Sequence, residues 1–178
     1  MKLAAIEEYG LRCALQLAAL KEGDVASASQ IAEKEGISVQ YASKILHLFR
    51  KANLVQAVRG IQGGFRLTLP PEQISVKSVF QTLRDEPAQD SFCDHFKGQQ
   101  AACVHMDECS VRPVWAVLTT YFDAVLEQLT LADLTRSEKD SQARVEKFAE
   151  HQLQQMRKRI LPTERVLSNL HETRTSRP

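Results

Sequence analysis

Residues 37–69 read ISVQYASKILHLFRKANLVQAVRGIQGGFRLTL, and this stretch decides the fold. It holds five Lys or Arg residues and neither Asp nor Glu, whereas the whole chain of 178 residues has a formal net charge of only +1. Positive charge is therefore concentrated in one place. Such a concentration favours contact with the polyanionic backbone of nucleic acid.

The first half of this stretch predicts a helix over residues 38–50. Ser38 can cap its start, because the hydroxyl oxygen can accept a hydrogen bond from a free backbone N–H in the first turn. Apolar residues recur at helical spacing and mark its buried face: Ala42, Ile45, Leu46 and Phe49. Polar residues remain for its outer face: Gln40, Tyr41, Ser43, Lys44 and His47.

The second half predicts a β-hairpin with strands over 54–58 and 65–69. Gly63 and Gly64 lie in the turn between them and are expected to supply the positive φ of a tight tip. A helix followed by a two-stranded ribbon is the outline of a winged helix-turn-helix.

The residues before this stretch complete the helix-turn-helix. Ala and Leu predict a helix over 2–21, and a shorter helix over 30–35 follows, capped by Ser27 or Ser29. Gly36 ends the shorter helix, as glycine often does at a helix terminus. The first helix is expected to support the pair from behind.

After the hairpin, Ser75 caps a further short helix, and Ser110 with Pro113 marks the start of a long one. The apolar stripe of the long helix is broad: Val114, Trp115, Val117, Leu118, Tyr121, Phe122, Val125, Leu126 and Leu129. A second copy of the same helix is its simplest cover, which predicts a two-fold homodimer. A short turn over 130–134 follows.

The fold class expected is therefore mainly α, a winged helix-turn-helix DNA-binding domain with a long C-terminal dimerisation helix. We expect the DNA-binding domain over 1–88, a cysteine-containing loop over 89–110 and the dimerisation helix over 111–135. A charged, partly helical extension over 136–178 completes the chain.

Composition excludes several classes of protein. Residues 1–71 carry nine Lys or Arg against six Asp or Glu, whereas residues 72–140 carry six against twelve, so the basic front contrasts with an acidic middle. Glu7 and Glu8 lie where a secretory signal peptide would have its apolar region, so the N-terminus does not have the pattern of such a signal. No apolar run is long enough to cross a bilayer. We expect a cytoplasmic protein without membrane contact. No catalytic motif indicates an enzyme.

Three cysteines lie close together in the loop, at Cys93, Cys103 and Cys109, separated by nine and then five residues. Thiolates are the usual ligands of iron–sulfur clusters and of zinc. Structural zinc usually shows close C-x-x-C pairs, so the wide spacing favours a cluster, of the [4Fe–4S] or [2Fe–2S] type. A fourth ligand has three sources: Glu8, His95 or His105.

Other interpretations of these residues stay open. The cysteines could form a thiol redox switch or a zinc site, and the winged module could act through a protein partner. Glu8 could simply pair with Arg12 four residues on. Cys13 lies on an apolar helix face and is interpreted as a core residue.

Several segments resemble the Rrf-type family of bacterial transcription regulators, which includes IscR, NsrR and RirA. They are EYGLR at 8–12, the helix-turn-helix, VRGIQGGFRL at 58–67, the cysteine loop and TLADL at 130–134. The resemblance covers about residues 1–135. It implies a dimeric winged-helix repressor or activator whose cluster controls DNA binding.

The chain departs from the family at informative positions. The first cysteine gap is longer than usual, and Arg112 replaces a histidine found in IscR-like members. Glu8 stands where NsrR-like members carry an aspartate ligand on the first helix of the other subunit. Arg12 stands where another subgroup has a histidine. The resemblance thus implies three cysteines plus Glu8 of the partner subunit as the cluster ligands.

The helix over 38–50 is expected to enter the major groove of a palindromic double-stranded operator. Gln can pair with adenine, and Lys can reach guanine acceptors. Two wing arginines would approach the phosphates or the minor groove. The full set of expected DNA contacts is Ser38, Gln40, Tyr41, Ser43, Lys44, Arg50, Arg59, Gln62 and Arg66.

Overall fold

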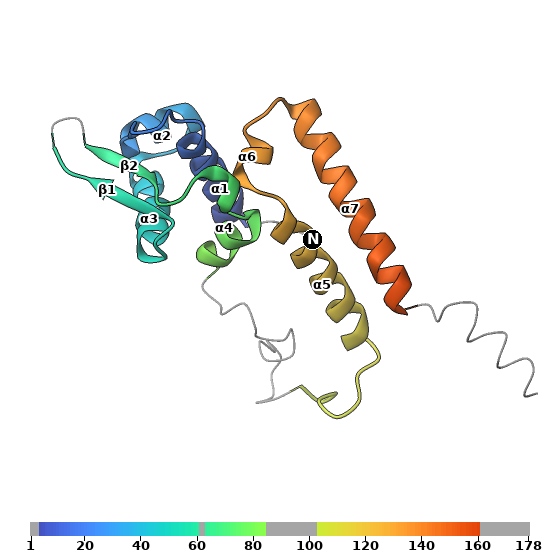
Figure 1. Ribbon diagram of the computed structural model, residues 1–178. Helices are drawn as coiled ribbons and strands as arrows, with labels where there is room; N and C mark the ends of the chain where they lie inside the picture. The colour runs from blue at the N-terminus through green and yellow to red at the C-terminus, as the bar shows by residue number, and fades with distance from the viewer. Residues whose placement is uncertain (1–3, 61–62, 85–102, 161–178) are drawn as a thin grey trace, which may run out of the picture.

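The computed structural model describes residues 4–60, 63–84 and 103–160. It confirms the mainly helical winged fold with a long C-terminal helix (Figure 1). The elements in order are α1 (Ala5–Ala18), α2 (Ala28–Glu35), α3 (Val39–Lys51), β1 (Val55–Val58), β2 (Gly64–Leu67), η1 (Pro71–Gln73), α4 (Val76–Leu83), α5 (Arg112–Gln128), α6 (Leu131–Leu134) and α7 (Glu138–Ile160). The first four helices and the hairpin gather into one module, from which α5 and α7 extend side by side.

Capping residues set the helix-turn-helix. The Ser27 hydroxyl accepts from the N–H of Gln30 at 3.2 Å, and Gly36 ends α2 with a left-handed φ of 65°. The Ser38 hydroxyl then accepts from the N–H of Tyr41 at 3.1 Å and starts α3. The predicted apolar face of α3 is fully buried: Ala42, Ile45, Leu46 and Phe49.

The hairpin is held to the helices by a third backbone segment. β1 and β2 pair antiparallel, with Val55 opposite Leu67. Ala26 adds a bridge to Phe65, whose N–H donates to the Ala26 carbonyl at 2.8 Å. The hairpin therefore has a fixed direction relative to α2.

Two of the hairpin glycines, Gly63 and Gly64, are required by close backbone contacts and not by a positive φ. Gly60 carries the positive φ, at 129°, and Gly63 and Gly64 do not, so that expectation for the latter two is wrong. A Cβ on Gly64 would lie 2.7 Å from the carbonyl carbon and oxygen of Ala26, and one on Gly63 would lie 2.5 Å from the Val58 oxygen. Both positions need a bare backbone because another backbone approaches closely.

We expect Gly64→Ala to lower the free energy of unfolding by about 1–3 kcal/mol, because the rigid Ala26 backbone must move to admit the methyl group. Gly36→Ala is the comparison: it has open space but a left-handed φ, so its cost is about 1 kcal/mol and only conformational. Urea unfolding measures both. A Gly64→Ala protein as stable as the parent would show that the hairpin does not rest on Ala26.

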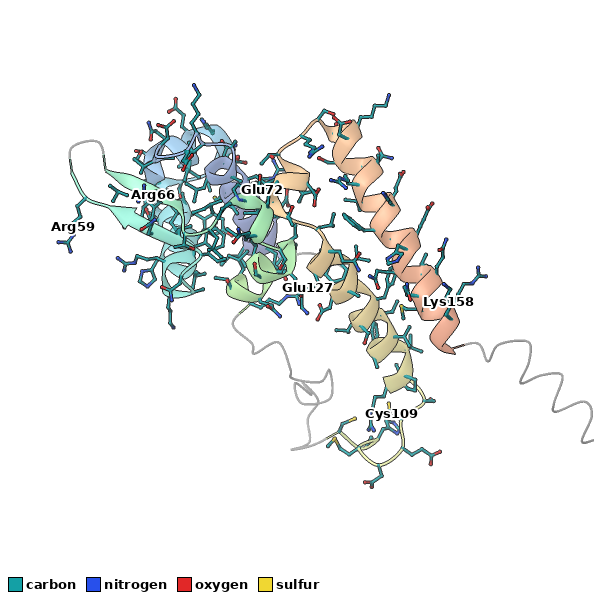
Figure 2. All side chains as sticks on the ribbon, in the orientation of Figure 1. Arg59, Arg66, Glu72, Cys109, Glu127 and Lys158 are labelled. Carbon is teal, nitrogen blue, oxygen red and sulfur yellow. The ribbon has the colours of Figure 1, made fainter. Side chains whose placement is uncertain are left out.

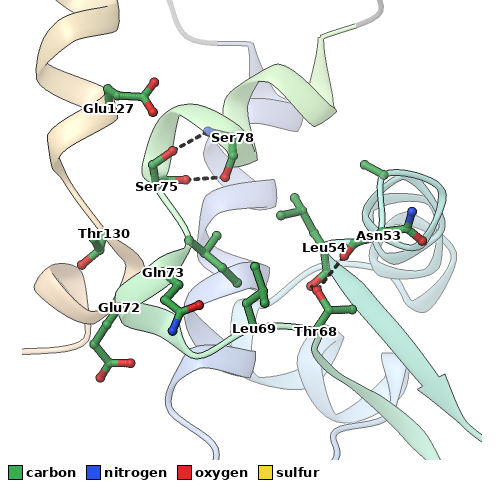
Figure 3. Close-up of a pocket in the computed structure, with 12 residues that line it drawn as sticks. Asn53, Leu54, Thr68, Leu69, Glu72, Gln73, Ser75, Ser78, Glu127 and Thr130 are labelled. Carbon is green, nitrogen blue, oxygen red and sulfur yellow. Dashed lines mark hydrogen bonds between the residues drawn. The ribbon is translucent and has the colours of Figure 1, made fainter.

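The start of α4 and the end of α5 are joined by a short backbone pairing. The Val76 N–H donates to the Leu129 carbonyl at 2.8 Å, and the Leu131 N–H donates to the Ile74 carbonyl at 3.0 Å. Beside this pairing lies a pocket of about 460 Å³, with Glu72 and Glu127 among its lining residues (Figure 3). These two backbone hydrogen bonds attach the end of α5 to the winged module.

The long helix is covered partly by the chain itself, which differs from the expectation. The Tyr121 hydroxyl donates to the Ala149 carbonyl of α7 at 3.1 Å, and Val145 and Phe148 of α7 pack against a buried cluster that includes Leu126 and Leu129. Large apolar side chains at the other end remain exposed: Val111, Val114, Trp115, Val117 and Leu118. The expected second copy is needed only for this end of α5.

The start of α5 also differs from the expectation. The helix begins at Arg112 with Val111 at the cap position and without a side-chain cap, so Ser110 does not cap it, whereas Pro113 lies in the first turn.

Among the residues that the structure describes, no helix has both the length and the hydrophobicity that crossing a membrane requires.

Candidate nucleic-acid interface and cysteine site

The outer face of α3 presents one polar stripe to solvent. Gln40, Ser43, Lys44 and His47 recur at helical spacing, and all four are exposed. Arg50 follows on the same face, with its guanidinium 3.4 Å from Nδ1 of His47. The capping of α3 already uses the Ser38 hydroxyl. The stripe has the size and chemistry of a helix that contacts base edges.

The basic residues around this stripe lack acidic partners among the residues that the structure describes. In the described parts of the chain, no carboxylate forms an ion pair with Lys44, Arg50, Lys51, Arg59 or Arg66. Arg59 points away from the helices at the outer part of the hairpin (Figure 2). Arg66 is half-buried, and its Nε is covered without a hydrogen-bond partner. Gln62, the remaining expected contact, lies outside the described residues.

A run of contacts connects α1 with the first turn of α3. Glu8 pairs with Arg12 at 3.0 Å, which is the i,i+4 pairing considered for it above. The Arg12 guanidinium lies over the Tyr9 ring at 5.9 Å, and Tyr9 meets Tyr41 edge-on at 6.1 Å. Tyr9 therefore contacts both Arg12 of its own helix and Tyr41 of α3.

Cys103 and Cys109 are free thiols, each half-buried in a short ordered segment. The Met106 N–H donates to the Cys103 carbonyl at 3.2 Å, and the Arg112 N–H donates to the Cys109 carbonyl at 3.3 Å. The Arg112 guanidinium donates to the carbonyls of His105 and Met106. Arg112 thus holds the segment between the two cysteines.

The cysteine segment lies beyond the end of α5 that is farthest from the winged module, as the position of Cys109 shows (Figure 2). In the view of Figure 1 the helix α1 lies near the opposite end of α5. The described residues contain no group of three metal-binding side chains. Cys93 and His95 fall outside those residues, so their place relative to Cys103 and Cys109 stays a prediction.

Cys13 is excluded from this chemistry. It is fully buried in α1, and burial, followed by the nearby Glu35 carboxylate, raises the pKa of its thiol to about 12. The thiol stays protonated at physiological pH and does not act as a thiolate ligand. The interpretation of Cys13 as a core residue is confirmed.

The family model Rrf2, described as an iron-dependent transcriptional regulator, matches residues 5–137. The chain belongs to the Rrf2 family. The Rrf2 match contains the winged module, the cysteine segment, α5 and α6, and it ends before α7. Transcription regulators of the Rrf2 family bind DNA, so the exposed stripe of α3 and the hairpin belong to a DNA-binding protein.

Individual relatives agree with the family assignment. The HTH-type transcriptional regulator NsrR of Bacillus subtilis is 30% identical over 140 residues, which are 79% of this chain and 94% of that protein. Protein rrf2 of Nitratidesulfovibrio vulgaris is 32% identical over 136 residues, 76% of this chain and 88% of its own.

Solved structures of two Rrf2-type proteins resemble this fold. IscR of T. potens has a TM-score of 0.61 at 28% identity, covering 75% of this chain and 85% of that one. The oxidized form of CymR from Staphylococcus aureus has a TM-score of 0.61 at 25% identity, covering 77% and 98%.

Two interactions near the site were absent from the sequence interpretation. Arg112 was noted only as a departure from the family, and its hydrogen bonds to the cysteine segment follow from the turn that the structure shows. Glu7 pairs with Arg84 over a separation of 77 residues. The charge pattern of α1 gave no local signal for it, since the partner lies on a distant segment.

Proposed function

We propose that this Rrf2-family protein is a homodimer whose affinity for a palindromic DNA operator is controlled by an iron–sulfur cluster. The ligands would be Cys93, Cys103 and Cys109 of one subunit and Glu8 of the partner subunit. The observation that carries the proposal is the pair of free, half-buried thiols of Cys103 and Cys109, held in one short segment of an iron-dependent family.

The donor set fits such a group. Cysteine thiolates are soft ligands that suit clustered iron, and a carboxylate is a weaker, exchangeable fourth ligand. Glu8 is about half exposed and engaged only by Arg12 among the described residues, so its carboxylate is available to another subunit. When bound, the cluster supplies a redox-sensitive centre whose ligands can be exchanged or lost.

The chain's own residues supply the connection to DNA. Ligation of Glu8 would take its carboxylate away from Arg12, and Arg12 would then settle differently over Tyr9. Tyr9 packs on Tyr41 in the first turn of α3, so the recognition helix would change its position in the groove. Operator affinity would follow the state of Glu8.

The dimer is proposed from the exposed end of α5. Val111, Val114 and Leu118 lie on one helical face, are about half exposed, and contribute an apolar patch that α7 does not cover. A second α5 would cover this patch and set the spacing of two α3 helices, as a two-fold operator requires.

A second candidate keeps the DNA binding without a cluster. The likeness to an oxidized form of CymR and the two free thiols, Cys103 and Cys109, favour a thiol redox switch. A cluster-free regulator could also hold zinc on the same thiols, or it could be controlled by a protein partner. In each of these cases the winged module would remain the DNA-binding part.

The proposal is tested on anaerobically purified protein. Genomic fragments bound by the protein are selected first, and the operator affinity is then compared before and after removal of iron with a chelator. We expect iron and acid-labile sulfide in the fresh protein and at least a fivefold change in operator affinity, the lower end of ordinary coupling. Iron-free protein that binds the same operator equally well would favour the second candidate.

A further inference from the structure

One apolar side chain interrupts the polar surface of α3. Among the described residues of the winged module, 4–60 and 63–84, large apolar side chains are exposed at only two positions, Val39 and Leu69. Val39 is the first residue of α3 and is 46% exposed. A lone exposed valine is common on protein surfaces, so its role follows from its surroundings.

The first turn of α3 has few side chains left for an outside contact. The Ser38 hydroxyl caps the helix, and the Tyr41 ring packs edge-on against Tyr9 of α1 at 6.1 Å. Val39 and Gln40 lie between these two residues, and both are exposed. The N-terminal residues of a helix in the major groove are those that reach base edges, so Val39 has the position of a base contact.

Helical spacing places Val39 on one flank of the polar stripe. Ser43 lies about one turn further along α3, and Arg50 lies about three turns further on the same flank. This face thus combines hydrogen-bonding groups, positive charge and one apolar group. The major groove offers the matching surface, because base edges present donors and acceptors, phosphates carry negative charge, and each thymine adds one methyl group.

The dimer contact proposed for α5 lies elsewhere on the protein. The helix α3 lies beside the hairpin, on the side of the winged module away from α5 and α7 (Figure 1). A second α5 that covers the apolar patch of the first therefore leaves Val39 open to another contact.

We propose that Val39 determines operator specificity by packing against the C5 methyl group of a thymine in each half-site. The inference rests on the part of the proposed function that places α3 against the operator, and it does not depend on the cluster. Thymine is the base that carries this methyl group. The contact therefore adds a preference for a T·A pair at one position to the hydrogen bonds that the neighbouring polar side chains make.

The experiment replaces each thymine of the selected operator by uracil in turn, at equivalent positions of both half-sites. Uracil keeps the pairing with adenine and the O4 acceptor and lacks only the methyl group. Fluorescence anisotropy measures binding of the full-length parent, Val39→Ala, Val39→Ile and Leu69→Ala. Leu69 is the matched control, because it is an apolar side chain 50% exposed that lines the pocket beside η1 and α4.

For the parent we expect uracil at one position to lower the affinity about fourfold for each half-site, the effect of burying one methyl group. Val39→Ala should bind the thymine operator about as weakly as the parent binds that uracil operator, and uracil should cost it little further. Val39→Ile and Leu69→Ala should keep the parental loss. The melting temperature of Val39→Ala should match that of the parent, because the side chain is about half exposed.

The outcomes separate this inference from the function beneath it. A parent that loses no affinity at any uracil position, or a Val39→Ala protein that keeps the parental loss at the same position, would overturn the contact by Val39. Unchanged operator affinity in Lys44→Ala as well would remove α3 from the operator and overturn both. A protein without any cluster that still shows the expected uracil losses would overturn only cluster control and support the contact by Val39.

Discussion

Lys44→Ala is expected to lower operator affinity by about 5- to 100-fold, the range that one good base contact contributes. Lys44 lies on the exposed stripe of α3 and, among the described residues, has no acidic partner. Its ammonium group is therefore free to reach guanine acceptors in the major groove. Fluorescence anisotropy with a labelled operator, at several salt concentrations, measures the loss.

Two further variants show whether the loss of affinity in Lys44→Ala is specific to the recognition helix. Lys147→Ala removes an exposed lysine from α7, remote from α3, and should leave the affinity unchanged. Arg59→Ala on the hairpin should weaken binding to all sequences and reduce the salt slope by about one, as loss of a phosphate contact does. Unchanged affinity in both Lys44→Ala and Arg59→Ala would place the function in a protein partner instead.

Cys109→Ser is expected to remove the cluster, so that iron and acid-labile sulfide fall to near zero. The serine hydroxyl is nearly isosteric with the thiol but is a hard, protonated oxygen, a poor ligand for clustered iron. The Cys109 carbonyl still accepts from the Arg112 N–H, so the segment should keep its turn. Iron analysis, sulfide analysis and an anaerobic absorption spectrum measure the result.

The control for this variant is Cys13→Ala. Its thiol is buried and protonated, with a pKa of about 12, so its removal should cost stability but no iron. If Cys109→Ser kept the parental iron content, or if Cys13→Ala lost its iron at an unchanged melting temperature, the assignment of the cluster ligands would be wrong. Loss of iron in both variants together with a lowered melting temperature of Cys13→Ala would instead indicate a general loss of structure in that control.

The winged module could be predicted from the sequence because its signals are local. Ser38 caps α3 through a residue three positions away, and the buried face of α3 follows from helical spacing alone. The hairpin was also placed within one residue or two. Its glycines were interpreted wrongly, because the backbone of Ala26, which excludes a side chain at Gly64, is 38 positions distant.

The arrangement around α5 could not be predicted in the same way. The sequence of α7 is charged and rich in Gln, and its few apolar residues do not predict which surface of the protein the helix packs against. The structure places Val145 and Phe148 beside α5, which reduces the surface left for a partner. Likewise, nothing near Glu7 in the sequence indicates Arg84, since an ion pair between distant segments has no local pattern.

The cysteine site depends on residues from different parts of the chain and, in the proposal, from two subunits. The spacing of Cys93, Cys103 and Cys109 predicts the type of ligand, and the structure adds the hydrogen-bonded turn that holds the last two. The spacing of residues within one chain cannot predict a fourth ligand that comes from another subunit. Glu8 was therefore assigned as the fourth ligand from the family resemblance, and the assignment stays a proposal.

A mixed dimer of one Cys109→Ser subunit and one Glu8→Ala subunit tests the central claim most directly. If Glu8 serves the partner's cysteines, one of the two sites combines intact cysteines with an intact Glu8. The other site then lacks both. If Glu8 serves its own subunit, each site lacks one ligand.

The measurement is the number of clusters per mixed dimer that survive a fixed chelator challenge, read by native mass spectrometry. The account predicts one cluster with the parental rate of loss, although both homodimeric variants lose theirs quickly or never bind them. A mixed dimer that holds no cluster of parental stability would contradict a ligand shared between subunits.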